Sequence, residues 1–355
     1  MQPFSYTALP GKVTFGFGTL AKVGEEIRGL GCSRALLLST PQQIGQVQAL
    51  RDQLGDLAVG LFSDATMHTP VEVTERALAY ALEVKADCVV ALGGGSTTGL
   101  GKAIAVRTDL PQVVIPTTYA GSEATPILGE TKDGLKTTQR GMKILPEVIV
   151  YDVDLTMTLP PGMTVTSGMN AIAHAAEGLY AKDGNPIISM IAEDGTRAIA
   201  RALPRIIANP SDREARSDAL YGAWACGVTL GAVGMSLHHK LCHTLGGTFD
   251  LPHAETHTVV LPHAMAYNAP AAPEAMRRLA AAIGAPNAPQ GLFDLSKSLG
   301  APTSLKELGM PESGLDRVVE LALANPYWNP RPLEAAPMRR LLEDAWHGRR
   351  PPEAI

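Results

Sequence analysis

The hydrophobic pattern changes once along this 355-residue chain, near Leu159-Pro160-Pro161, and this change constrains the fold more than any other feature. Before it, short apolar runs alternate with segments whose apolar residues recur at helical spacing. The runs predicted to be strands are 34–40, 58–62, 88–92, 113–116 and 147–151, with helices at 43–54 and 71–86 and an opening strand and glycine-rich turn at 11–20. This alternation predicts a parallel sheet with crossover helices.

Beyond the two prolines the strand pattern fades, and alanine-rich helical patterns follow. The helices expected there cover 167–180, 186–207, 212–243, 272–283 and 314–324. A chain of this length has room for about two domains. We therefore predict an α/β fold in which a parallel-sheet domain at 1–158 precedes an all-helical domain at 159–355.

Charge and composition exclude several classes of protein. The formal net charge is −5 and aromatic residues make up 5% of the chain, so it lacks both the basic excess and the stacking residues that nucleic acids require. The four cysteines form no C-x-x-C pair, which favours reduced core thiols in a cytoplasmic protein. The start of the chain has no secretory pattern. The 19 uncharged residues at 219–237 are rich in Gly and Ala, and we expect a buried core helix rather than a membrane span.

A glycine-rich segment follows one of the predicted strands. Gly93-Gly94-Gly95-Ser96 leads from the apolar run into a helix, where the free N–H groups of the first turn suit a pyrophosphate. The spacing is not that of G-x-G-x-x-G, and a purely structural tight turn is the alternative. A second polar turn, with Thr117 and Thr118, follows the next strand. Ligands gather at the carboxyl ends of such strands, so the two turns together favour a nucleotide site.

Histidines are concentrated in one short segment. Six of the nine lie at 238, 239, 243, 253, 257 and 263. His239 and His243 are spaced i, i+4 and share a helix face, and Asn170 and His174 have the same spacing upstream. Any one histidine is more often a core residue than a ligand. The set predicts an active site with a pocket to which His253 contributes.

These blocks, in this order, resemble the iron-containing alcohol dehydrogenase superfamily, which shares its fold with dehydroquinate synthase. The resemblance rests on GGGS at 93–96, PTTYAGSE at 116–123, LPEVIVYD at 145–152, SGMNAIAHAAE at 167–177 and HHKLCHTLGG…LPHAETH at 238–257. It implies an N-terminal Rossmann-like domain, a C-terminal helical domain, an active site in the cleft between them, and hydride transfer with NAD(P). It also implies a homodimer.

The chain departs from the superfamily pattern at three positions. The usual ligand aspartate is replaced by Asn170, and the other ligand positions correspond to His174, His239 and His253. A neutral amide is a weak ligand for a hard cation, so we expect no metal, although a three-histidine zinc site stays chemically open. An aspartate common after the glycine loop is Gly99 here. Thr40 stands where an acidic residue often binds the ribose, so NADH or NADPH is expected.

These departures resemble one branch of the superfamily, the maleylacetate reductases, which reduce 2-maleylacetate to 3-oxoadipate. That resemblance implies hydride addition to an alkene conjugated to a ketone, with hydrogen-bond donors stabilising the enolate. His243 and His239 are the expected donors, and Lys240, Lys102 or Lys136 would face the small dicarboxylate substrate. The predicted catalytic residues are His243, His239, His253, His174 and Asn170; the predicted cofactor residues are Thr40, Gly94, Gly95, Ser96, Thr117, Thr118, Ser122 and Lys136.

Three alternatives stay open at this point. A metal-dependent alcohol or polyol dehydrogenase of the same superfamily would bind iron or zinc, which Asn170 argues against. A lyase similar to dehydroquinate synthase would also need a metal. A nucleotide-binding regulator without turnover would have no use for the histidine cluster.

Overall fold

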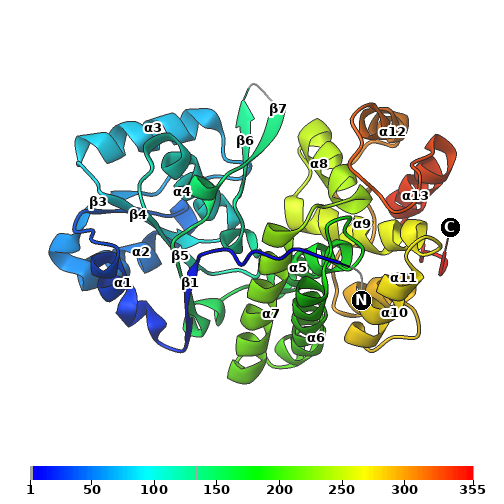
Figure 1. The fold of residues 1–355 in the computed structure, drawn as a ribbon, viewed down its shortest axis with the longest axis horizontal. Helices are drawn as coiled ribbons and strands as arrows, with labels where there is room; N and C mark the ends of the chain where they lie inside the picture. Colours follow the sequence, from blue (N-terminus) through cyan, green and yellow to red (C-terminus); the bar gives the residue numbers. More distant parts are fainter. Residues whose placement is uncertain (1–2, 133–134, 355) are drawn as a thin grey trace. The chain divides into compact units, whose positions relative to one another are not determined.

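The protein is described from a computed structural model that covers residues 3–132 and 135–354, with the side chains of 135 and 136 excluded. The chain forms two compact units (Figure 1): one spans 9–159, and the other combines 160–354 with the described residues before position 9. The predicted first domain also included those opening residues. They group instead with the helical unit, because the sheet begins only at Lys12.

The first unit is built on a parallel sheet with the strand order β1-β8-β5-β4-β2-β3. The strands are β1 Lys12–Gly16, β2 Ala35–Leu38, β3 Ala58–Phe62, β4 Cys88–Gly93, β5 Gln112–Pro116 and β8 Val148–Asp152. Every residue of β2, β4, β5 and β8 is buried. Continuous apolar runs of this kind are typical of parallel strands covered on both faces. The α/β fold and the predicted strands are confirmed.

Helices cover both faces of this sheet (Figure 1). On one face α1 (Val23–Gly29) and α2 (Ile44–Leu54) pack through apolar side chains such as Ile27 and Leu50. On the other face α3 (Val71–Glu83) and α4 (Gly95–Thr108) pack through Ala77 and Leu100. The helices after β2 and β4 thus lie on opposite faces, although these strands are neighbours. A topological switch point therefore lies at their carboxyl ends, where open α/β sheets bind ligands.

An antiparallel hairpin was not predicted. Its strands are β6 (Ile127–Lys132) and β7 (Leu135–Arg140), which project from the unit in Figure 1. Most of their residues are polar, so the hairpin lacks the apolar run by which the other strands were identified.

The second unit is helical. Its helices are α5 Pro161–Gly178, α6 Pro186–Ala208, α7 Arg213–Ala232, α8 Leu237–Phe249, α9 His253–Asn268, α10 Pro273–Ile283, α11 Ala288–Ser298, α12 Leu315–Ala324 and α13 Ala335–His347. Helix α5 is buried continuously from Thr164 to Gly178 and forms the centre of the unit. Its polar side chains, Asn170 and His174 among them, therefore lie inside the protein.

The single helix predicted at 212–243 is wrong, because α7 ends at Ala232 and α8 begins at Leu237 with a bend of 96°. The break is held by carboxylates: Asp183 accepts a hydrogen bond from the Gly234 N–H at 2.9 Å, and Glu177 accepts one from the Ser236 N–H at 2.7 Å.

In the described ranges no single helix is long and apolar enough to cross a membrane; α7 and α8 meet that test only as a bent pair.

Candidate functional site

The glycine loop lies between β4 and α4, as the sequence predicted, and the space around Gly93 and Gly94 is too small for a side chain. A Cβ at Gly93 would lie 2.3 Å from Thr97 Oγ1 and 2.5 Å from Gln43 Oε1, and one at Gly94 would lie 3.0 Å from Thr118 Cγ2. No side chain caps the N-terminus of α4. Its first-turn N–H groups are thus available to an anion.

The second polar turn lies against this loop. The Thr117 N–H donates to the Gly93 carbonyl at 3.1 Å, and a Cβ at Gly95 would be 4.0 Å from Ser122 Oγ. Gln43 joins the turn to the end of β2, since its Nε2 donates to Thr117 Oγ1 at 2.6 Å and its Oε1 lies 3.3 Å from Thr40 Oγ1. Sequence reasoning missed Gln43, because nothing in its spacing distinguishes it from any helix residue.

A pocket of about 320 Å³ lies beside these turns at the switch point. Thr40 and Ser96 line it, together with residues after β3 that include Asp64 and Met67. The structure therefore gathers seven predicted cofactor residues at one edge of the sheet: Thr40, Gly94, Gly95, Ser96, Thr117, Thr118 and Ser122. The eighth, Lys136, lies in β7, and its side chain is outside the described part of the structure.

Lys102 is not available as a cation for the substrate, contrary to the prediction. It is 1% exposed, and its Nζ donates to the carbonyls of Ser122 (2.5 Å), Thr125 (2.8 Å) and Ile127 (2.9 Å). Burial lowers the pKa of Lys102 to about 7, and the nearby carboxyl of Glu123 opposes this shift. Lys102 anchors the second turn to α4.

Gly99 has a structural explanation. A Cβ there would lie 2.4 Å from Thr69 Oγ1. With Thr69 in this position, the aspartate that is common in the superfamily would overlap the threonine hydroxyl.

The histidine cluster lies within the helical unit, where α5, α8 and α9 each supply side chains. Helix α5 carries Asn170 and His174, α8 carries His239 and His243, and His253 begins α9. The His239 and His243 rings are 6.1 Å apart and those of His174 and His239 are 5.1 Å apart, measured between centroids. Asn170, His174 and His239 are buried, whereas His243 and His253 are partly exposed. The structure thus brings the predicted catalytic residues to one region of the unit.

Glu177, which the sequence analysis did not single out, organises this cluster. Its buried carboxylate accepts hydrogen bonds from the N–H groups of Ser236 (2.7 Å) and His238 (2.7 Å) and from Nδ1 of His239 (2.8 Å). It thereby caps the N-terminus of α8, where a negative charge is favourable. Its position, three residues after His174 on the same helix face, was the available signal.

These contacts determine the tautomers. Because the Glu177 carboxylate only accepts, neutral His239 carries its proton on Nδ1, and its Nε2 then accepts from His174 Nδ1 at 2.9 Å. Neither ring nitrogen of His239 is then left to donate to a substrate. The predicted role of His239 as a donor is therefore corrected: it connects His174 to Glu177.

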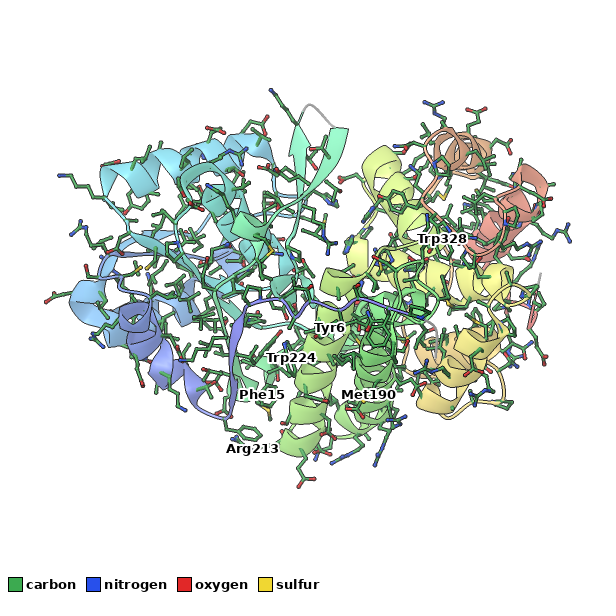
Figure 2. The ribbon with its side chains drawn as sticks, viewed as in Figure 1. Tyr6, Phe15, Met190, Arg213, Trp224 and Trp328 are labelled. Carbon is green, nitrogen blue, oxygen red and sulfur yellow. The ribbon has the colours of Figure 1, made fainter. Side chains whose placement is uncertain are left out.

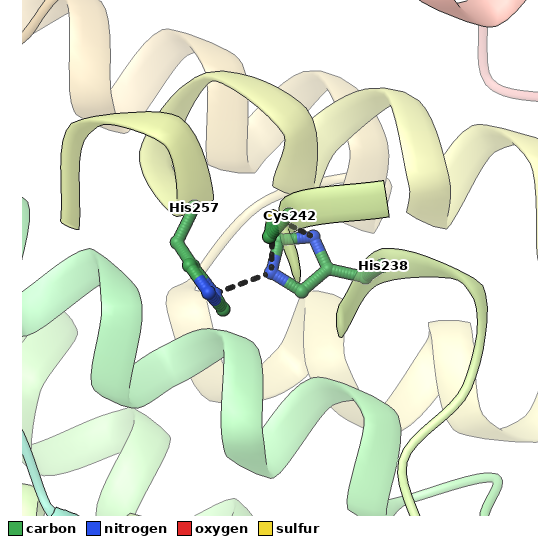
Figure 3. Close-up of side chains that lie close together, drawn as sticks. All are labelled: His238, Cys242 and His257. Carbon is green, nitrogen blue, oxygen red and sulfur yellow. Dashed lines mark hydrogen bonds between the residues drawn. The ribbon is translucent and has the colours of Figure 1, made fainter. Parts of the chain in front are cut away.

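A second histidine pair lies beside the first (Figure 3). His238 Nε2 and His257 Nδ1 are hydrogen-bonded at 2.9 Å, and Cys242 Sγ lies 3.7 Å from His238 Nε2. Burial, reinforced by the neighbouring histidines, holds the pKa values of His238 and His257 well below the ordinary value. Both rings are therefore neutral at neutral pH. Burial raises the pKa of the Cys242 thiol, as does the Glu177 charge, so the sulfur keeps its proton.

Tyr327 fixes the orientation of His243. Its hydroxyl lies 3.1 Å from His243 Nδ1, and burial and the Glu177 charge raise its pKa, so the phenol stays protonated. In one of the two histidine tautomers this hydroxyl donates to Nδ1. His243 then presents Nε2–H as a donor. Lys240 Nζ lies 5.6 Å from the centre of the Tyr327 ring. Tyr327 comes from the loop between α12 and α13, as does its neighbour Trp328 (Figure 2).

Two buried polar atoms in the cluster, Asn170 Oδ1 and His257 Nε2, have no hydrogen-bond partner. Unpaired buried atoms are rare, and those at functional sites mark places for a polar ligand or water. His263 does not belong to the cluster, although the sequence analysis grouped it with the other five histidines. Its ring packs against Phe293 with the centroids 6.4 Å apart, as a core residue.

The donor set does not fit the iron ion that the superfamily implies. Asn170 offers a neutral amide, and Nε2 of His239 is hydrogen-bonded to His174 Nδ1. In the described part of the chain, the ring nitrogens of His174, His239 and His253 do not all come within 4.8 Å of one another. All four cysteines are buried free thiols, as predicted. Ligand atoms of Cys242, His238 and His257 lie within 4.8 Å of one another, as do those of Cys32, Asp87 and Cys88.

Comparison with known proteins agrees with this fold. Residues 10–153 match the iron-containing alcohol dehydrogenase family, and residues 164–346 match its C-terminal part. The chain belongs to this family and is an NAD(P)-dependent oxidoreductase.

Three relatives illustrate the similarity. A maleylacetate reductase from Rhizobium sp. (strain MTP-10005) is 61% identical over 99% of this chain and 100% of its own length. The crystal structure of maleylacetate reductase from Agrobacterium tumefaciens superposes with a TM-score of 0.95 at 61% identity, covering 99% of this chain and 100% of that one. A putative alcohol dehydrogenase from Ralstonia eutropha JMP134 superposes with a TM-score of 0.98 at 55% identity and the same coverage.

Proposed function

We propose that this chain reduces the C=C bond of 2-maleylacetate to 3-oxoadipate with NADH or NADPH, in the degradation of aromatic compounds. The similarity to maleylacetate reductases over nearly the full length supports this assignment. The structural observation that carries it is the Glu177–His239–His174 hydrogen-bond chain, in which His174 and His239 correspond to two of the superfamily's metal-ligand positions.

The reaction needs one hydride and one proton. Bound NAD(P)H supplies the hydride, which adds to the alkene carbon β to the ketone and leaves an enolate. Protonation of the carbon α to the ketone then completes 3-oxoadipate. The enolate charge is shared between oxygen and carbon, so hydrogen-bond donors suffice where a localised alkoxide would gain more from a Lewis acid.

The residues of the helical unit provide these donors. His243, whose Nδ1 contacts the Tyr327 hydroxyl, is the donor that we assign to the enolate oxygen. His174 is the proton donor that we assign to carbon, because the Glu177 carboxylate balances a positive charge on it through His239. Lys240, partly buried beside Tyr327, is the cation that we assign to a substrate carboxylate.

The nucleotide site fits a dinucleotide through its glycine cradle. Any side chain at Gly93 or Gly94 would overlap Thr97 or crowd Thr118, so the backbone itself forms the surface that approaches the phosphates. The uncapped start of α4 supplies the N–H donors.

We propose that activity requires no metal. The test is activity after dialysis against a strong chelator, with elemental analysis of the same sample. Asn170→Asp, which restores the ligand carboxylate, is expected to raise divalent-metal affinity without raising maleylacetate turnover. Loss of activity on removal of a stoichiometric metal would contradict the proposal.

Substrate comparison separates this function from the metal-dependent alternative. Purified protein is given NADH with 2-maleylacetate, and separately NAD⁺ with simple alcohols and polyols, while reduced nicotinamide is followed by absorbance. Rapid consumption of NADH only with the dicarboxylic enone is expected. Turnover of plain alcohols that depends on added iron or zinc would instead identify an alcohol dehydrogenase.

We further propose that the protein acts in the cytoplasm as a homodimer, without nucleic-acid or membrane partners. Sedimentation of the purified protein tests the dimer, and fractionation of the native cells tests the location.

A further inference from the structure

The nucleotide pocket contains a carboxylate that the sequence analysis did not foresee. Thr40, at the end of β2, lacks the acidic group that commonly binds the adenosine ribose, and its hydroxyl is turned toward Gln43. Asp64, two residues after β3, lines the same pocket as Thr40 and Ser96. Among the described residues that line the pocket, it is the only one with a charge.

The sheet places Asp64 beside Thr40, the position at which the ribose is expected. Strands β4, β2 and β3 are consecutive neighbours, so the phosphate loop, Thr40 and Asp64 follow one another along the edge of the sheet. Two strand spacings of about 4.8 Å each separate Asp64 from the phosphate loop, which is roughly the span from a pyrophosphate across the attached adenosine. Ser96 lies in the first turn of α4 at the phosphate end, and Met67, 44% exposed, supplies an apolar surface beside Asp64.

Asp64 forms an ion pair on its exposed side. Arg76, on α3, places Nη2 at 3.2 Å from Asp64 Oδ2, and both side chains are 59% exposed. Arg76 does not line the pocket itself. It reduces the negative charge that Asp64 presents there, and one carboxylate oxygen stays outside this contact.

We propose that Asp64 is the residue that sets the preference between NADH and NADPH, and that Arg76 tunes it. The carboxylate accepts a hydrogen bond from the adenosine 2′-hydroxyl of NADH and repels the 2′-phosphate of NADPH. Because Arg76 partly neutralises Asp64, the repulsion is moderate and NADPH remains usable. This inference rests on nucleotide binding, not on the identity of the substrate.

Asp64→Asn, Arg76→Met and the double variant test the proposal. The first assay is calorimetric binding of adenosine 5′-monophosphate and adenosine 2′,5′-bisphosphate; the second is kcat/KM with NADH and with NADPH. Asp64→Asn is expected to raise the ratio of NADPH to NADH efficiency about tenfold, and Arg76→Met to lower it several-fold. The double variant should match Asp64→Asn within twofold, because Arg76 acts through Asp64.

Glu75→Gln is the matched control. Glu75 precedes Arg76 on α3 and pairs with Arg107 at 3.3 Å, so its replacement removes one exposed negative charge outside the pocket. If Glu75→Gln leaves the ratio of NADPH to NADH efficiency unchanged, the effect of Asp64→Asn comes from the pocket itself. A tenfold rise of that ratio in Glu75→Gln would overturn the proposal.

Two further outcomes would also overturn the proposal. In the first, the ratio of NADPH to NADH efficiency in Asp64→Asn stays within twofold of that in the parent protein. In the second, the double variant uses NADPH far less well than Asp64→Asn does, which would make Arg76 the ligand of the 2′-phosphate. The binding assay needs no substrate, so failure of the maleylacetate assignment would leave its result intact. Conversely, failure of the Asp64 proposal would leave enone turnover unchanged.

Discussion

Replacing Glu177 by Gln tests whether a buried carboxylate orders the histidine network. The side chain keeps its shape, but one acceptor oxygen becomes an NH₂ group that faces N–H donors. With the NH₂ in place of Oε1, the His238 N–H at 2.7 Å loses its partner. With the NH₂ in place of Oε2, the Ser236 N–H and His239 Nδ1 are affected instead.

The magnitude follows from these contacts. One unpaired buried N–H costs about 1–3 kcal/mol, and loss of a negative charge at the start of α8 adds about 0.3–2 kcal/mol. We expect the free energy of unfolding to fall by about 1–5 kcal/mol. The Tm should fall by roughly 2–4 °C for each kcal/mol lost. We also expect kcat to fall by about 10²–10³, since His174 loses the charge that balances it. KM for maleylacetate should change little, because the loss is confined to the transition state.

Asp152→Asn is the matched control. Asp152 is a buried carboxylate of the other unit that accepts from the N–H groups of Gly18 (3.0 Å), Leu20 (2.8 Å) and Asp154 (3.0 Å). Its replacement should cost similar stability and leave kcat unchanged below the unfolding temperature. Glu177→Asp should restore part of kcat. If the Glu177 and Asp152 amide variants lose stability alike and both keep their kcat, Glu177 is only a helix cap and the assigned role of His174 fails.

Three further predictions concern other parts of the molecule. His243→Ala should lower kcat by about 10²–10³ with little change in KM, whereas the exposed His347→Ala should not, and steady-state kinetics checks both. Lys102→Met should raise KM for NADH more than KM for maleylacetate, because the turn at 122–127 loses its anchor; equal changes would argue against this. Burial lowers the pKa of His263 to about 4, so between pH 6.5 and 4 only the unfolded state binds this proton, and stability falls as pH falls, by about 3 kcal/mol in all. His263→Leu should remove that part of the pH dependence in urea unfolding, since neither ring nitrogen has a hydrogen bond to lose.

Local pattern determined much of this protein. Apolar runs such as 88–92 identified the buried parallel strands, because both faces of such a strand are covered and polar residues are excluded from it. The Gly93–Ser96 loop was identifiable because a strand followed by glycines and a helix places backbone N–H groups at one point. The i, i+4 spacing of His239 and His243 placed both on one face of a helix, and α8 shows them so.

Only the tertiary structure decided which of these residues touch. Glu177 contacts His239 across 62 positions of sequence and Tyr327 contacts His243 across 84, and no periodicity encodes such pairs. The break between α7 and α8 could likewise not be predicted from the local sequence. The N–H groups at the break donate to the carboxylates of Asp183 and Glu177, which lie in distant parts of the chain. The sequence suggested Lys102 as a cation for the substrate, but in the structure its ammonium group is buried and donates to backbone carbonyls. Sequence specifies which groups are present, whereas burial and hydrogen bonds between distant segments decide which of them remain available for chemistry.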